Sequence, residues 1–214
     1  MITRPTQIVN YLTPSLRYGV GGFDTTIFTL TITPATPPLK GSLLLIFMAG
    51  GTTTQSPETT PPGFTWYTSV ASSWGLQLYA KVSDGTETSF TFTYNPSRSP
   101  AWFYHEWLNL ELNGAVIVQP ASGLQGPNTS PWTTPSFNVP VKGVTFYCGA
   151  KNETSLITAG APWNTISASG QQKSAWQIFN DFAAAQTITW TKSGGGTFSF
   201  NTMIVSFHAK KVRI

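Results

Sequence analysis

Few side chains in this sequence could perform acid–base, nucleophilic or metal chemistry. The chain has two histidines, His105 and His208, eight carboxylates and one cysteine, Cys148. His105 and Glu106 are adjacent in an expected strand, so their side chains point to opposite faces and cannot form a dyad. A metal site between the two histidines would need acidic partners at a spacing that strands allow, and none is evident. We therefore expect no metal and no cofactor.

Carboxylate pairs are the next candidates, because a glycosidase needs two of them across a cleft. Glu106 and Asp181 fall in expected strands and are the pair to test, although the sequence gives no reason to place them together. Asp84 and Glu87 belong to an expected turn. We find no nucleophile-elbow, dinucleotide-binding or phosphate-loop motif. The chain is therefore expected not to be an enzyme, and polysaccharide degradation is the third of three functional alternatives.

Tryptophans near turns are better candidates for a binding role. An exposed indole can stack on a sugar or become buried in a partner subunit. Trp66, Trp74, Trp132 and Trp163 lie in or beside expected turns. We take these four as the candidate ligand-binding residues, with a host surface glycan as the candidate ligand. The alternative is that the same indoles cap the hydrophobic core.

The composition favours a sheet protein that assembles with others. Only 9% of the residues are charged, against about 25% in an average globular domain, and 14% are aromatic. Aromatic and β-branched side chains pack well on pleated sheets. So few charges give little electrostatic repulsion between neighbouring molecules, which predicts a homo-oligomer; the alternative is a monomer with a Thr- and Ser-rich surface.

The charge distribution gives no sign of nucleic-acid binding. The net charge is +4, and Lys210, Lys211 and Arg213 lie together at the C-terminal end. No basic stripe or arginine-rich face is evident elsewhere. The single cysteine excludes an internal disulfide. Residues 1–20 lack an apolar signal-peptide core, and the longest apolar run, Leu43 to Ala49, is too short to span a bilayer, so we expect synthesis in a cytoplasm without membrane insertion.

Short strands bounded by Gly, Pro, Asn and Ser recur about every ten residues, which predicts a sandwich or barrel. In Ser89–Tyr94 the aromatic residues alternate with hydroxyl residues, as in a half-buried strand. Leu43–Ala49 is apolar on both faces and is typical of a central strand. The predicted strands are Thr26–Thr33, Ser42–Ala49, Thr65–Val70, Leu76–Val82, Ser89–Tyr94, Trp102–Leu110, Ala115–Gln119, Ser136–Val139, Val144–Gly149, Thr165–Ala168, Ala175–Phe182, Thr187–Thr191 and Thr202–Ala209.

Two halves of the sequence resemble each other in the order of their segments. Lys-Gly followed by an apolar strand occurs at 40–49 and again at 142–149, and Leu76-Gln77-Leu78-Tyr79 matches Trp176-Gln177-Ile178-Phe179. We predict an all-β, jelly-roll-like or immunoglobulin-like sandwich of two internally similar halves, because one sheet alone would leave an apolar face uncovered. The expected divisions are an N-terminal arm or edge strand (1–23), the first half (24–112), a Gly/Pro/Ser-rich connection (113–134) and the second half (135–214), with 24–214 sharing one core or forming two domains.

Several of these segments resemble a motif found in structural proteins of tailed bacteriophages. The matching parts are Gly-Ser-Leu-Leu-Leu-Ile-Phe-Met-Ala-Gly at 41–50, Pro-Pro-Gly-Phe-Thr-Trp at 61–66, Leu-Tyr-Ala-Lys-Val at 78–82 and Asp-Gly-Thr-Glu at 84–87. The sequence departs from the motif at Phe64, where tryptophan is commoner, and in the aromatic-rich strand 102–107. The resemblance covers roughly residues 24–209. It implies a sandwich in a tail fibre, a receptor-binding protein or a head decoration or fibre protein.

The expectation for function follows from this resemblance. It implies a non-enzymatic virion component, assembled in a bacterial host cytoplasm, that acts through subunit packing and adhesion. Its expected partners are other virion proteins and itself, with a trimer as the first guess, and neither nucleic acid nor a membrane. A lectin-like module that recognises host surface glycans through Trp132 or Trp163 is the second alternative. Head and tail locations are not distinguished.

Overall fold

The computed structural model describes residues 9–25, 27–49, 59–70, 76–113, 116–120, 124–126, 132–134, 136–139, 142–151, 157–169, 172–192 and 198–213. Every regular element within these ranges is a β-strand, and the sheets are antiparallel. This confirms the all-β, sandwich-type fold class expected from the sequence.

The first half contains an inner sheet and a covering pair of strands. The inner sheet has the order β2 (Ser15–Phe23), β8 (Ala101–Leu108), β4 (Leu43–Ala49), β6 (Leu76–Val82) and β5 (Thr65–Val70). The covering pair is β3 (Ile27–Ile32) and β7 (Phe90–Arg98). The alternation seen in Ser89–Tyr94 explains this pairing, because Phe90, Phe92 and Tyr94 are buried while Thr91 is exposed.

The second half has the same kind of arrangement. Its inner sheet has the order β10 (Leu124–Gly126), β19 (Phe198–His208), β13 (Gly143–Lys151), β16 (Gln172–Phe179) and β15 (Asn164–Ser169), and β9 (Val116–Pro120) also pairs with β19. The covering strands are β11 (Trp132–Thr133), β18 (Thr189–Lys192) and β14 (Ile157–Ala159), with β12 (Phe137–Val139) and β17 (Ala183–Gln186) forming a separate pair.

The strand orders of the two inner sheets correspond. β8-β4-β6-β5 in the first sheet and β19-β13-β16-β15 in the second are built from the segments that resemble each other in the sequence. The internal repeat and the domain divisions remain predictions, since strand order describes connectivity alone. The segment expected to connect the halves nevertheless supplies β9, β10 and β11, and β2 lies at the edge of the first inner sheet.

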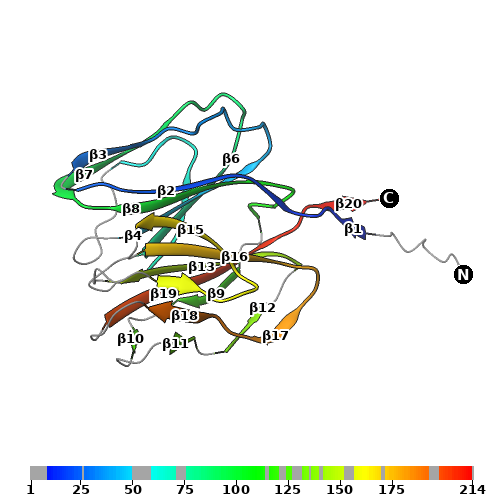
Figure 1. Cartoon of the computed structure of the whole chain (residues 1–214). Coiled ribbons are helices and arrows are strands. Elements are labelled where there is room, and N and C mark those ends of the chain that lie inside the picture. Colours follow the sequence, from blue (N-terminus) through cyan, green and yellow to red (C-terminus); the bar gives the residue numbers. More distant parts are fainter. Residues whose placement is uncertain are drawn as a thin grey trace, which may run out of the picture.

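The sheets form four stacked layers, which Figure 1 shows with β3 and β7 at the top and β18, β17 and β12 at the bottom. The two inner sheets face each other across an apolar layer, here called the inner core. Its fully buried members come from both halves: Leu43, Leu45, Phe47, Leu76, Leu78, Ala80, Ala101, Phe103, Trp107, Leu110, Val144, Phe146, Met203, Val205 and Phe207.

Each inner sheet is also buried on its other face. Leu44, Ile46 and Met48 of β4 point away from the inner core and pack under β3 and β7 in the first outer core. Tyr147 of β13 packs in the same way under the covering strands of the second half. The two-faced apolar character of Leu43–Ala49 therefore predicted its central position correctly, because strands buried on both faces have continuous apolar sequences.

The chain ends meet at one side of this stack. β1 (Val9–Tyr11) pairs only with β20 (Lys211–Arg213) within the described residues, and this two-stranded ribbon stands beside the layers (Figure 1). Next to the ribbon, Leu110 and Ala209 form an antiparallel bridge between the ends of β8 and β19. The last strands of the two halves are thus tied together where the ribbon begins.

Several predicted strands were wrong in their extent; the strand predicted at Thr202–Ala209, for example, begins at Phe198 as β19. Ala175–Phe182 was expected as a single strand, but β16 ends at Phe179 and Asp181 lies in a bend before β17. The carboxylate of Asp181 accepts a hydrogen bond of 2.9 Å from the backbone N–H of Phe182. Asp side chains commonly make such local bonds in turns, and this competes with continuation of a strand.

The inner core predicts that both halves unfold together. Phe146 contacts the rings of Phe47, His105, Trp107 and Phe207, so it joins the two inner sheets. We expect Phe146→Ala to lower the free energy of unfolding by about 3–5 kcal/mol and to shift a single transition, because it leaves a cavity between the sheets. Urea unfolding followed by both tryptophan fluorescence and circular dichroism measures this.

The control for this variant is Phe28→Ala. Phe28 is 63% exposed, so its removal is expected to change the free energy of unfolding by less than about 0.5 kcal/mol. Two separate transitions, of which only one responds to Phe146→Ala, would contradict the shared inner core.

Candidate functional site

Of the four tryptophans proposed for ligand binding, Trp163 is the one whose side chain is described. It is 8% exposed and packs against Phe137 and Phe179 in the second outer core, so its indole offers little surface to a sugar. Trp66 lies in β5 and Trp132 in β11, but their side chains lie outside the described residues, as does the whole of Trp74.

The two histidines occupy different environments. His105 pairs with Leu45 in the middle of β8, is fully buried in the inner core, and lies 3.1 Å from Ser174 Oγ across the two halves. His208 pairs with Gly143 at the end of β19 and is partly exposed. Burial lowers the pKa of His105 to about 3, so it is neutral and structural at neutral pH.

Glu106 holds a loop onto β8. Its fully buried carboxylate forms an ion pair with Arg17 of β2 and accepts a hydrogen bond of 2.8 Å from the backbone N–H of Leu39. The Arg17 guanidinium also donates to Thr36 Oγ1 and to the Pro37 carbonyl. Both oxygens of Glu106 are thus engaged within the fold, which explains how a fully buried carboxylate is accommodated.

The proposed carboxylate pair is not assembled. Glu106 bonds to β2 and to the 36–39 loop in the first half. Asp181 is an exposed residue of a bend in the second half and bonds to its own neighbour. Asp181 was expected to lie in a strand, and the turn chemistry described above is the reason that it does not.

A second acidic cluster organises the turn after β6. Glu87 accepts a bond of 2.7 Å from Ser83 Oγ and pairs with Lys81 at 2.9 Å, and it also accepts the backbone N–H of Gly85. Although burial opposes it, these bonds lower the pKa of Glu87 to about 2. Gly85 has a φ of +87°, as expected for a tight turn at Asp84-Gly85, but β6 and β7 lie in different sheets, so this turn does not close a hairpin. The cluster therefore shapes a turn.

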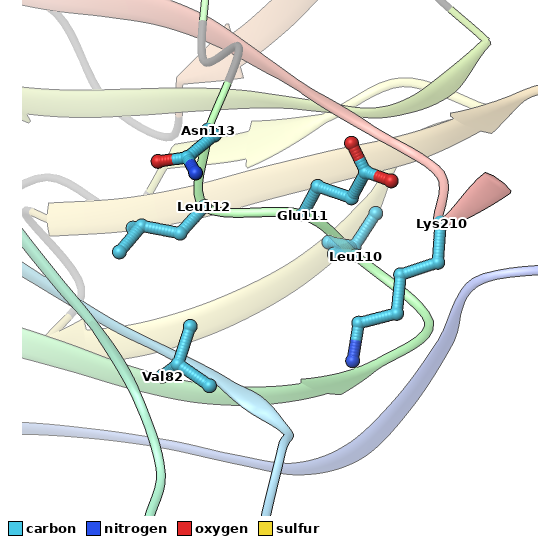
Figure 2. Close-up of a pocket in the computed structure, with 6 residues that line it drawn as sticks. All are labelled: Val82, Leu110, Glu111, Leu112, Asn113 and Lys210. Carbon is cyan, nitrogen blue, oxygen red and sulfur yellow. The ribbon is translucent and has the colours of Figure 1, made fainter.

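An open cleft lies where the two halves and the chain ends meet. Its volume is about 390 Å³, and Figure 2 shows Val82 of β6 facing the 110–113 segment, with Lys210 at one side. The apolar lining comes from Val82, Leu110 and Leu112. Glu111 and Lys210 add one charge of each sign. The cleft could hold an apolar side chain of a partner.

Cations gather beside this cleft. The ammonium groups of Lys142 and Lys211 lie 5.2 Å and 5.9 Å from the centre of the Tyr11 ring. Lys210 Nζ donates to the Gly41 carbonyl at 2.7 Å. None of these three lysines forms an ion pair with another described residue. We call Tyr11, Lys142, Lys210 and Lys211 the terminal basic cluster.

The described part of the chain holds no group of three or more histidine, cysteine or acidic side chains suited to a metal ion. Likewise, none of its elements is a helix that could cross a bilayer. Cys148 lies in β13 opposite Ser174 and Met203. Its side chain lies outside the described residues, so its expected burial remains a prediction.

Comparison with known proteins identifies no relative. No protein-family model matches the chain, and neither a curated protein nor a solved structure is significantly similar to it.

Sequence reasoning did not find the terminal basic cluster. The run of basic residues near the C-terminus is visible in the sequence, but Tyr11 joins it through the pairing of β1 with β20, and Lys142 joins it through the pairing of β13 with β19. The alternation of Val9, Asn10 and Tyr11 is too short to predict a strand, and contacts between distant segments are not visible in local patterns.

Burial of His105 predicts a dependence of stability on acid. Its pKa is about 3 in the folded chain and 6.5 in the reference state, so the unfolded chain binds the proton first. The stability that this neutral histidine supplies is complete above pH 6.5 and is lost as the pH falls towards 3. Between pH 7 and pH 4.5 we expect a loss of about 3 kcal/mol in the free energy of unfolding.

The matched variant is His105→Leu, which removes the titrating group and keeps an apolar side chain in the inner core. Urea unfolding at both pH values should show a clearly smaller loss for this variant than for the unaltered chain. Equal losses in the two proteins would show that His105 does not set the acid response.

The two carboxylates proposed as a catalytic pair should differ sharply in their structural importance. Glu106→Gln leaves the Arg17 guanidinium without its anion in a partly buried site, and we expect a loss of about 3 kcal/mol in the free energy of unfolding. Asp181→Asn changes an exposed turn residue and should cost less than about 0.5 kcal/mol. Thermal unfolding compares the two variants directly, and equal effects would argue against a structural role for Glu106.

Proposed function

We propose that the chain is a non-enzymatic structural protein of a bacteriophage virion, in a head decoration, head fibre or tail fibre position. It acts through subunit packing and adhesion. The observation that carries the proposal is the four-layer body. Its described histidine and carboxylate side chains make their bonds to other groups of the fold. The resemblance of segments 41–50, 61–66 and 78–87 to phage structural proteins supplies the biological setting.

The hydrogen bonds made by the polar groups that could have served in catalysis support this proposal. His105 is neutral in the inner core, Glu106 holds the 36–39 loop, and Glu87 holds a turn. Each of them is bonded to other groups of the fold, whereas a catalytic acid and base have to face a substrate from a shared cleft. The cleft beside Lys210 offers an apolar lining that suits packing better than proton transfer.

The outer faces of the stack support a packing role. Thr31 and Thr91 lie 3.3 Å apart on the exposed face of β3 and β7, and Thr133 and Thr189 lie 2.9 Å apart on the covering strands of the second half. At these positions both outer faces carry hydroxyl groups and no charge. Uncharged sheet faces can approach a neighbouring subunit without the cost of desolvating charges.

Two other functions were considered from the sequence, and the structure favours neither. Of the four candidate tryptophans, Trp163 is the one whose side chain is described, and it packs in an outer core. No observation therefore favours a lectin site. Glu106 and Asp181 are held apart by their own bonds, so nothing observed singles out polysaccharide degradation. Packing and adhesion remain the best supported of the three functions.

Association in solution tests the proposal. Sedimentation velocity over a range of concentrations should show reversible homo-oligomers, and a density map of an intact particle should contain this four-layer shape. Thr91→Lys combined with Thr189→Lys places a charge on each outer face and should weaken association by about tenfold or more, because each buried like-charge contact costs several kcal/mol.

The control is the pair Thr91→Ser and Thr189→Ser, which keeps the hydroxyl groups and adds no charge. A chain that stays monomeric at every concentration, and that is absent from the particle, would rule the proposal out.

A further inference from the structure

The ribbon formed by β1 and β20 exposes apolar surface that nothing in the described chain covers. Tyr11, Leu12 and Val212 are 36%, 39% and 39% exposed. A two-stranded ribbon is marginally stable by itself in water, and an exposed strand edge is a template for pairing with another chain. A further strand could therefore pair with the ribbon.

The hydrogen-bond pattern identifies which edge is open. The backbone N–H of Leu12 donates to the Lys210 carbonyl at 2.9 Å, and Tyr11 is the partner of Lys211 in the register. In an antiparallel ladder, the N–H and C=O groups of Tyr11 and Lys211 therefore point outwards, on opposite edges. Glu111 covers the β20 edge, because its carboxylate accepts the Lys211 N–H at 3.1 Å.

The β1 edge remains open at Tyr11. Among the described residues β1 pairs with β20 alone, so the outward groups of Val9 and Tyr11 are available to a further strand. Such a strand would run beside the Tyr11 ring. It would therefore also run beside the ammonium groups of Lys142 and Lys211.

The positive charge beside the β1 edge indicates which kind of polypeptide could add there as a further strand. A second copy of β1 would bring a second set of the same lysines to the edge, and like charges placed opposite each other are destabilising. An acidic strand would instead neutralise ammonium groups that have no carboxylate partner within the described chain. Glu111 accepts the backbone N–H of Lys211 through Oε1 and forms no ion pair with these lysines within the described residues.

We propose that the open edge of β1 binds an extended, acidic polypeptide segment of another protein by strand addition. Backbone bonds to Val9 and Tyr11 would supply the pairing, and carboxylates of the segment would contact Lys142 and Lys211. An apolar side chain of the same segment could enter the cleft beside Val82 and Leu112. The inference rests on the proposed function in one respect, since a neighbouring virion protein would supply the segment.

A short peptide of alternating valine and glutamate, blocked at both ends, is the probe. Titration calorimetry should detect binding that weakens as salt rises. Lys142→Glu combined with Lys211→Glu should weaken binding by about tenfold or more, because each exposed ion pair contributes up to about fivefold. The charge-conserving pair Lys142→Arg and Lys211→Arg should bind as the unaltered chain does.

Strand addition is tested separately from charge. Hydrogen exchange should show that the peptide protects the Tyr11 amide. Val9→Pro removes one outward N–H while leaving the inward bonds of Asn10 and Leu12, so it should weaken binding without unfolding the ribbon. A peptide of alternating valine and lysine should not bind.

Three results would overturn the inference. They are a lack of peptide binding, equally tight binding of polygalacturonate without protection of Tyr11, and self-association that the lysine reversals abolish. The second would identify a general polyanion surface, and the third would identify a second copy as the occupant. A failure here leaves the proposed function standing, because particle location and self-association through the outer faces are measured independently.

Discussion

The structure depends on burying both faces of both inner sheets. Phe47 of β4 and Phe146 of β13 meet in the inner core, while Ile46 and Tyr147 on the opposite faces of the same strands enter the outer cores. A sheet with one exposed apolar face would be unstable alone, so the covering strands and the opposite half are both required. This constraint explains why the central strands are so rich in aromatic residues and why so few charges remain to be placed.

The layer arrangement also explains how the polar side chains of the inner sheets are bonded. A polar side chain on an inner strand has no solvent-facing position, and several of these side chains have a partner inside, whereas Tyr104 Oη, His105 Nδ1 and Trp107 Nε1 are buried without a hydrogen bond to another described group. His105 reaches Ser174, Thr145 bonds to Ser206 at 2.8 Å, and Glu106 recruits Arg17 and the Leu39 amide. Each contact crosses between strands or halves, and each therefore contributes to a unique alignment of the sheets rather than to a reactive site.

Much of the fold could be predicted from the sequence, because alternation and turn residues are local signals. Thr65–Val70 and Leu76–Val82 have the predicted bounds, whereas Asp181 shows how a local turn ended a strand that periodicity alone would extend. The candidate site could not be predicted in the same way. The terminal basic cluster joins Tyr11, Lys142 and Lys211 through pairing between the two ends of the chain, and neither residue spacing nor composition reports such a contact.

The distribution of charge distinguishes the outer faces of the stack from the ribbon formed by β1 and β20. The outer faces carry hydroxyl pairs such as Thr31 with Thr91, so contacts there require little desolvation and favour extensive packing between like surfaces. The ribbon of the chain ends instead carries like charges beside an open strand edge, which penalises pairing with itself and rewards an acidic partner. Under the two proposals, the outer faces serve self-association, and the lysines of the terminal basic cluster, which form no ion pair within the described residues, serve attachment to a different protein.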